Sequence, residues 1–439
     1  MKSKAYRGID VNHIDGRTLC QGHDGQALVV GFDVGKYRLA AVARWPDGRF
    51  ERPWLADNPA QVPRVVCLLQ QLAAQRSVTV ALEPSGTYGD PLRQALQDAG
   101  LTVQRVSPKA AHDYAEVFDG VPSQHDGKDA AVVAELAALG KAQPWPYLPP
   151  SEWEQELAFW VEWMDAQAHQ LTMWLGRIEA LLSRHWPEAT SVLRVSSATL
   201  LRILEVYGGP AVLADDPKAA VRLQQWGGRF LDPAKVQRLL RTAQETAGVR
   251  QGLWDRQRLQ AYAGQALQVR REVRQGQRRL RQLAAGHAVL QAQGKVIGVP
   301  TACVLWSCVG DPRQYSCGAA YRKAMGLNLT ERSSGIYQGK LKISKRGHPR
   351  PRKWLYFAVL RLVKQAGVAQ WYQAKKGRDG QQAKRALVGV MRKLVPALYR
   401  IAVTGAAFEA GKLFAACASG PRARRRGGKG MAGERSRRK

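Results

Sequence analysis

The sequence of 439 residues predicts an α/β domain, then a region of long helices, then a mostly helical and strongly basic domain. Three observations support this order. Short apolar runs alternate with helical patterns over residues 27–141. Longer stretches then follow in which apolar residues recur three and four positions apart, as is typical of helices. Residues 291–439 hold 32 Lys and Arg against 5 Asp and Glu, so the last third is basic.

The apolar segments of the first domain are typical of buried strands. Residues 27–32 ("ALVVGF") predict a central strand, and residues 37–44 predict a strand beside it. "VTVALE" at residues 78–83 and "LTVQRVS" at residues 101–107 predict two more, with helical patterns between them. Residues 1–26 show no such pattern, and we expect them to form a loose N-terminal extension.

The helical region follows a segment that is rich in proline, "AQPWPYLPPSEW". Proline at this density ends a domain, so we expect a linker there. Helical periodicity over residues 157–186 and 251–285 predicts an extended helical hairpin or coiled coil around a small helical insert. The expected organisation is a linker at residues 142–152, a helical coiled-coil region at 153–293, a third domain at 294–415 and a disordered basic tail at 416–439.

The composition argues against several classes of protein. No run of 18 apolar residues is present, so we expect no membrane span. The first ten residues lack the apolar core of a secretory signal, which favours a cytoplasmic protein. The cysteines form no C-x-x-C pair, which argues against a zinc site and fits a reducing compartment. The six are Cys20, Cys67, Cys303, Cys308, Cys317 and Cys417.

The net charge of +32 is concentrated in one part of the chain. Residues 1–150 carry 16 basic and 16 acidic side chains, and residues 151–290 carry 19 and 14. Charge that is confined to the last third is typical of a protein that binds a phosphate backbone. We therefore expect a nucleic acid as partner and association with the nucleoid.

Four acidic residues are candidates for a metal site. Asp33 and Glu83 stand at the carboxyl ends of predicted buried strands, where the ligands of open α/β sheets gather. Asp126 and Asp129 are three residues apart, so on a helix they share one face. The alternative is that Asp126 only caps its helix, which is the commoner role for an aspartate at a helix start. Carboxylate oxygens suit Mg²⁺, with Mn²⁺ as a substitute, in phosphoryl transfer.

The sequence resembles a known family in three segments, which are "GFDVGK", "ALEPSGTYGDPL" and "HDGKDAAVVAEL". They are similar to the D…E…D-x-x-D pattern of the DEDD transposases of insertion-sequence family 110, whose motif E-[AP]-[ST]-G-x-Y is matched by residues 83–88. The likeness covers residues 28–415. It implies a RuvC-like, RNase H-type fold for residues 27–141. It also implies that the catalytic metal ligands are Asp33, Glu83, Asp126 and Asp129.

Ser334 is a candidate nucleophile in the basic domain. A serine in a loop with glycine is most often a turn residue, and one beside cations can also simply bind a phosphate. The block "GL…SG…GK…ISKRGH…R" resembles the C-terminal transposase domain of the family, which implies that Ser334 attacks DNA and forms a phosphoserine link. Ser333 and Tyr337 remain alternatives. The expected nucleic-acid-binding residues are Lys340, Lys342, Lys345, Arg346, Arg350, Arg352 and Lys353.

The resemblance also implies partners. The family assembles as dimers through the coiled coil and as tetramers, with the acidic site and the serine supplied by different subunits. A noncoding bridge RNA pairs with double-stranded donor and target DNA, which is consistent with the absence of a visible base-reading motif. The leading hypothesis is thus an RNA-guided transposase that moves its own insertion sequence. The alternatives are a RuvC-like metal-dependent junction resolvase or DNA invertase without an RNA guide, and an inactive nucleic-acid-binding relic.

Overall fold

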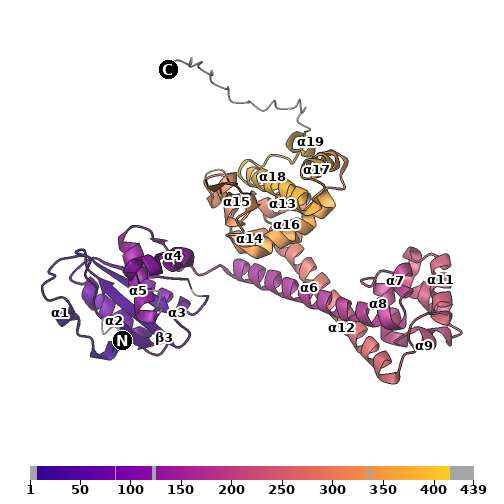
Figure 1. Ribbon diagram of the computed structural model, residues 1–439, viewed down its shortest axis with the longest axis horizontal. Helices are drawn as coiled ribbons and strands as arrows, with labels where there is room; N and C mark the ends of the chain where they lie inside the picture. The colour runs from indigo at the N-terminus through magenta and orange to yellow at the C-terminus, as the bar shows by residue number, and fades with distance from the viewer. Residues whose placement is uncertain are drawn as a thin grey trace, which may run out of the picture. The chain divides into compact units, whose positions relative to one another are not determined.

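The computed structural model of the chain describes residues 7–84, 86–120, 125–331, 333–334, 337–339 and 341–415 (Figure 1). Contacts divide the chain into two compact units, Met1–Pro149 and Pro150–Lys439. The boundary falls inside the proline-rich segment that the sequence predicts as a linker. The expected basic tail, residues 416–439, lies outside the described residues.

The first unit is built on a mixed sheet of seven strands in the order β1-β4-β3-β2-β5-β6-β7. β2 pairs antiparallel with β3 and parallel with β5, and β5 pairs parallel with β6. This sheet confirms the α/β prediction and fits an RNase H-like domain. The strands are β1 (Ile9–Asp10), β2 (Leu28–Val34), β3 (Arg38–Arg44), β4 (Trp54–Asp57), β5 (Val78–Leu82), β6 (Thr102–Arg105) and β7 (Gln143–Pro144).

Helices cover both faces of the sheet. On one face, α2 and α3 pack through apolar residues such as Leu69 and Leu96 against Phe32 of β2. On the other face, α5 packs small residues, including Ala130, against β3, and α4 packs against α5 beside it. The bounds are α2 (Val62–Ala73), α3 (Asp90–Asp98), α4 (Pro108–Asp119) and α5 (Asp126–Ala138).

The expectation of a loose N-terminal extension is wrong for the described residues after position 8. β1 pairs in parallel with β4, and a short helix, α1 (Gly16–Leu19), follows it. Val11 is fully buried in the same core as Phe32. The physical reason is that single apolar residues, rather than a periodic pattern, anchor this segment.

The second unit contains two long helices, α6 and α12, which confirm the helical predictions. α6 (Glu152–His185) starts at a capping box formed by Ser151 and Glu154, and α12 (Leu253–Leu283) packs along it. The pair is antiparallel, because Trp153 at the start of α6 donates its Nε1–H to the carbonyl of Leu283 at 3.1 Å. A coiled coil in the strict sense stays a prediction.

A small helical insert joins the far ends of α6 and α12. Its helices share one apolar core with both long helices, through residues such as Leu182 on α6, Leu204 on α8 and Leu259 on α12. The insert comprises α7 (Ala189–Val192), α8 (Ala198–Tyr207), α9 (Pro210–Ala214), α10 (Ala219–Gly227) and α11 (Pro233–Gln244).

The C-terminal part is mostly helical, as predicted, and shares a core with the start of α6, including Leu157 and Val161. None of the helices in the described part of the chain has the length and apolar character needed to cross a bilayer. The helices are α13 (Ala288–Ile297), α14 (Val299–Val309), α15 (Gly318–Ala324), α16 (Pro349–Leu362), α17 (Ala366–Arg378), α18 (Ala383–Thr404) and α19 (Ala410–Leu413), with short strands β8 (Leu329–Thr330), β9 (Ser333–Ser334), β10 (Tyr337–Gln338) and β11 (Lys342–Ile343).

Candidate active site

The sheet places Asp33 and Glu83 at the ends of neighbouring strands. β2 and β5 run in parallel with Phe32 paired to Leu82, so Asp33 and Glu83 each come next in their strands' direction. Phe32 and Leu82 belong to the core under α2 and α3. Because side chains alternate across a strand, Asp33 faces the other side of the sheet, on which α5 lies. Asp33 is the penultimate residue of β2 rather than a residue beyond it.

Helix α5 lies directly on β2 because residue 31 is glycine. A Cβ atom there would lie 2.3 Å from the backbone oxygen of Ala130 and 2.3 Å from the backbone nitrogen of Ala134. Only a residue without a side chain allows this approach. An ion pair between Arg44 on β3 and Glu135 on α5, both largely buried, joins the helix to the neighbouring strand.

The start of α5 carries the other two acids. Asp126 and Asp129 both lie in its first turn, where the positive end of the helix stabilises carboxylates. The N-cap is His125, whose Nδ1 accepts a hydrogen bond from the Lys128 N–H at 3.1 Å. Asp126 therefore does not cap the helix, and the alternative interpretation from the sequence is wrong. Residues 121–124, which precede His125, lie outside the described residues.

Electrostatic coupling shows that the four carboxylates gather in one region. Burial, followed by the charges of Asp126, Asp129 and Glu83, raises the pKa of Asp33 from 3.8 to about 6. Burial and the charge of Asp129 raise the pKa of Glu83. Burial also raises the pKa of Asp129, with the charge of Asp126 acting in the same direction. The structure thus brings the other three acids that the sequence singled out close enough to Asp33 for their charges to act on it.

The donor set of this region suits a divalent cation. Four carboxylates offer only oxygen ligands, which Mg²⁺ prefers, and a cation would balance the charges that raise the pKa of Asp33. Within the described residues, no three His, Cys, Asp or Glu side chains lie close enough together to enclose an ion. The carboxylates therefore lie close enough to interact, but not in the geometry of metal ligands.

Lys128 is the buried cation of this region. It stands between the two aspartates in the sequence of α5, its side chain is 1% exposed, and its Nζ donates to Asp119 Oδ1 at 2.7 Å. This contact joins the end of α4 to the start of α5. It therefore helps to hold in place the first turn of α5, which carries Asp126 and Asp129.

Asn58 is a residue of the site that the sequence did not identify. Its buried side chain donates from Nδ2 to the carbonyl oxygens of Gly35 at 2.9 Å and Tyr88 at 3.2 Å. These two residues lie in the segments that follow Asp33 and Glu83, so Asn58 ties both segments together. An asparagine before a proline is an ordinary turn signal, and nothing in the sequence marks this role.

Ser334 lies in the second unit, on a pair of short hairpins. β9 pairs antiparallel with β10, with Ser334 opposite Tyr337 and Ser333 opposite Gln338. Both serines are exposed, and alternation along the strand directs them to opposite faces. Gly335, which follows the serine in the family's motif, lies outside the described residues. The three candidate nucleophiles are thus neighbours, and the geometry does not select among them.

The expected nucleic-acid-binding cations differ in their surroundings. Arg350 and Lys353 on α16 pair with Asp165 on α6, at 3.4 and 2.8 Å. Arg352 donates from Nη1 to the carbonyl of Met325 at 2.9 Å and to two further carbonyls. These three cations hold the domain together, whereas Lys342, Lys345 and Arg346 have no carboxylate partner among the described residues. Lys340 lies outside the described residues.

Comparison with known proteins agrees with this arrangement of an α/β domain that carries four neighbouring acids before a basic helical domain. Residues 30–187 match the family model of the DEDD transposases of IS110 elements. Residues 287–374 match the model described as "Transposase IS116/IS110/IS902 family". The "Insertion element IS110 uncharacterized 43.6 kDa protein" of Streptomyces coelicolor is 24% identical over 398 residues, which cover 87% of this chain and 95% of that protein. The two models together match more than half of the chain, and we conclude that it belongs to the IS110 family of DEDD transposases, which are DNA-recombining enzymes.

Proposed function

We propose that this transposase excises and inserts its own insertion sequence by metal-dependent strand exchange through a covalent serine–DNA intermediate. The observation that carries the proposal is that Asp33 and Glu83, at the carboxyl ends of β2 and β5, lie near Asp126 and Asp129 at the start of α5, so that their charges act on one another. Carboxylates that are held together against their mutual repulsion are typical of sites that bind a divalent cation.

The cation would be held by the four carboxylates of Asp33, Glu83, Asp126 and Asp129. Because these ligands are all oxygen atoms, Mg²⁺ is the favoured ion and Mn²⁺ a substitute. A bound divalent cation supplies charge neutralisation at the phosphate and orientation of the scissile bond. The chain's own residues set the position of these ligands. Gly31 and the Arg44–Glu135 pair hold α5 on the sheet, and Asn58 holds the two segments that follow the acids.

Ser334 would act as the nucleophile. Its Oγ forms a bond to the phosphorus of one DNA strand, and the bond from phosphorus to the departing sugar oxygen breaks. The serine loses its hydroxyl proton, and the departing sugar oxygen gains one, so the step consumes no water. The freed hydroxyl later attacks the phosphoserine bond to join strands. This energy-conserving exchange, rather than hydrolysis, is what rejoining of DNA requires.

We propose further that a bridge RNA guides the exchange and that the acidic site of one subunit serves the serine of another. The charge distribution supports a large nucleic-acid load, since residues 291–439 hold 32 basic side chains against 5 acidic ones. Guidance by base pairing agrees with a sequence that shows no motif for reading bases.

The test is a denaturing pull-down of the protein from cells that carry its whole element with flanking DNA. DNA that remains attached in detergent is sequenced for wild type, Ser334→Ala and Asp126→Ala. We expect adducts at the element junctions in wild type and none in either variant. Adducts that persist in Ser334→Ala would assign the nucleophile to Ser333 or Tyr337. Cleaved DNA without any adduct would instead favour the hydrolytic junction resolvase.

The same pull-down tests RNA guidance. RNA that copurifies under native conditions is sequenced and compared with the element's noncoding ends. A noncoding RNA from those ends, with loops complementary to the donor and target junctions, is the expected result. Recombination that continues after the noncoding ends are replaced by unrelated sequence would contradict the role of the RNA.

A further inference from the structure

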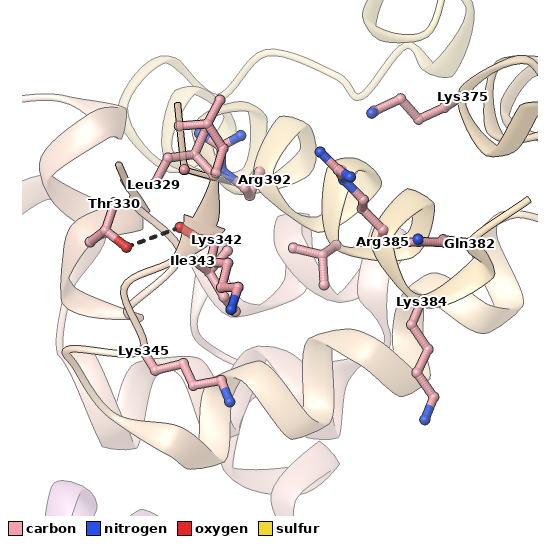
Figure 2. Close-up of a pocket in the computed structure, with 14 residues that line it drawn as sticks. Leu329, Thr330, Lys342, Ile343, Lys345, Lys375, Gln382, Lys384, Arg385 and Arg392 are labelled. Carbon is pink, nitrogen blue, oxygen red and sulfur yellow. Dashed lines mark hydrogen bonds between the residues drawn. The ribbon is translucent and has the colours of Figure 1, made fainter. Parts of the chain in front are cut away.

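A basic cavity lies in the C-terminal domain (Figure 2). Its volume is about 1190 Å³, and it lies between the hairpin β8–β11, the helix α17 and the start of α18. In Figure 2, Lys375, Arg385 and Lys384 lie on one side of this space, whereas Arg392 of α18 lies on the other side beside Leu329 of the hairpin. Six of the residues that line it are cations, namely Lys342, Lys345, Lys375, Lys384, Arg385 and Arg392.

The charges around this cavity are poorly balanced. Asp379 pairs with Lys375 and, at 3.8 Å, with Arg385. The other four cations have no carboxylate within ion-pair distance among the described residues. Arg392 is partly buried, and its Nε donates to the carbonyl of Leu327 at 2.9 Å. Cations that repel one another across a recess destabilise the fold unless an anion occupies it.

The start of α18 adds to this positive potential. The helix has 22 residues, its N-cap residue Gln382 makes no side-chain capping bond, and its first turn holds no acid. Lys384 and Arg385 occupy that turn instead, although acids are the side chains that a helix N-terminus favours. The positive end of the helix and both cations thus act together at the cavity, which is the arrangement that binds phosphate groups.

The cavity lies close to the candidate nucleophile. Thr330 lines it and pairs with Lys342 at the base of the hairpins, and Ser334 follows only four residues later. A chain of four residues spans at most about 14 Å, so the cavity is within a few nucleotides of the serine. Leu329, Ile343 and Val388 supply apolar wall beside the cations, which suits sugar and base surfaces next to phosphates.

We propose that this cavity binds the phosphate backbone of a nucleic-acid strand next to Ser334. The inference deepens the proposed function and rests on it for the assignment of Ser334. It extends the nucleic-acid interface to Lys375, Lys384, Arg385 and Arg392, which the sequence did not single out. The DNA strand that is cut and the guide RNA share this phosphodiester chemistry, and the arms of the test separate them.

The test measures binding of the full chain to fluorescent oligonucleotides by anisotropy, over a series of KCl concentrations and in EDTA. The pocket variant is Lys384→Glu with Arg385→Glu. The matched control is Lys364→Glu with Arg400→Glu, which makes the same change in charge at exposed positions of the same domain outside the cavity. Single-stranded DNA, single-stranded RNA and duplex DNA form three separate arms. Circular dichroism checks that both variants are folded.

We expect the pocket variant to bind at least one strand type at least about tenfold more weakly than the control, because two phosphate contacts are lost. The slope of log affinity against log salt should fall by about 1.4, at roughly 0.7 per contact on a single strand. The oligonucleotide type whose affinity falls identifies the kind of strand that the cavity binds. Equal losses in the pocket variant and the control would overturn the proposal, since binding would then follow total charge.

The readout separates this inference from the proposed function. Binding in EDTA needs neither the serine nor the metal ligands. Adducts in wild type together with unchanged oligonucleotide binding in the pocket variant would overturn the cavity proposal and leave the serine mechanism in place. Weakened binding in the pocket variant, with no adducts in wild type, would support the cavity and contradict the mechanism.

Discussion

Asp33 is the residue at which the electrostatics of the acidic site are most evident. Its carboxyl is partly buried on the sheet and faces three other carboxylates, and these effects raise its pKa to about 6. A pKa that is higher in the folded chain than in the unfolded chain means that ionised Asp33 opposes folding. The stabilising contribution is complete below about pH 4 and is lost as the pH rises through 6.

Asp33→Asn is therefore expected to stabilise the metal-free protein at pH 7. The shift of about two pKa units corresponds to at most ~3 kcal/mol, and partial solvent exposure reduces the expected gain to about 1 kcal/mol. Hydrogen exchange of β2 and α5 in EDTA measures the effect. We also expect Mg²⁺ to protect these elements in wild type and much less in the variant.

Asp24→Asn is the control, because Asp24 is an exposed acid of the same unit. It should change neither the exchange rates of β2 and α5 nor their response to Mg²⁺. A wild-type chain whose β2 and α5 exchange at the same rate with and without Mg²⁺ would argue against a metal site at these acids.

Helix α5 is the element that brings the second pair of acids near the first. β2 and β5 supply Asp33 and Glu83 through sheet register alone, whereas Asp126 and Asp129 depend on where the helix starts. His125 caps that start, and the close contact with β2 at Gly31 sets how near to the sheet the helix lies. The distance between helix and sheet therefore controls whether the carboxylates act on one another.

Gly31→Ala is expected to displace α5 and to separate the two acidic pairs. Its Cβ would meet backbone atoms at 2.3 Å, which cannot move independently of the helix. Overpacking of this kind destabilises by about 2 kcal/mol or more. We expect faster hydrogen exchange in α5 and β2 and loss of DNA adducts.

Gly176→Ala on α6 is the matched substitution. A Cβ there meets nothing within 4 Å, and alanine favours a helix over glycine by about 0.5–1 kcal/mol. It should leave stability unchanged or slightly raised and should keep adduct formation. Equal effects of the two substitutions would show that the approach of α5 to the sheet does not position the acids.

At the scale of the whole molecule, the acidic and basic chemistry lie in different units. The acids that we assign to the metal belong to the unit Met1–Pro149, and Ser334 belongs to Pro150–Lys439. Residues 1–150 carry no net charge, so the affinity for nucleic acid comes mainly from the second unit. Under the proposed function, the metal ligands thus belong to one unit, and the nucleophile and most of the positive charge belong to the other.

A mixture of Ser334→Ala and Asp126→Ala chains is expected to recover adduct formation that neither variant shows alone. The reason is that, in the proposed assembly, the acids of one subunit serve the serine of another, so each variant supplies the group that the other lacks. Coexpression of differently tagged variants, followed by the denaturing pull-down, measures it. The adduct should be carried only by the chain with Asp126→Ala, and failure to recover any would place both groups in one chain.

Much of the fold could be predicted from the sequence, because the decisive signals are local. The apolar run before Asp33 predicts β2, and three- and four-residue spacing predicts α6 and α12 within a few residues of their ends. Val11 was missed because a single apolar residue with a non-local partner leaves no periodic pattern. His125 was missed as a cap because histidine is seldom an N-cap residue.

Of the cations that line the cavity, only those in the basic stretch shortly after Ser334 were predicted from the sequence. Lys342 and Lys345 stand in a dense basic stretch, and both line the cavity. Lys375 and Arg392 reach the same cavity from helices further along the chain, and only tertiary packing brings them there. Likewise, no local pattern predicts the ion pair between Asp165 on α6 and Arg350 on α16.

The position of the boundary between the two units also bears on how such genes can change. A crossover in the codons of the proline-rich segment near Pro149 would join the acidic half of one transposase to the serine half of another without splitting a core. Hybrid transposases made at this junction should fold more often than those joined within α6, whose residues belong to two cores at once. The junction is therefore the natural place to exchange nucleic-acid preference while the acidic site is inherited intact.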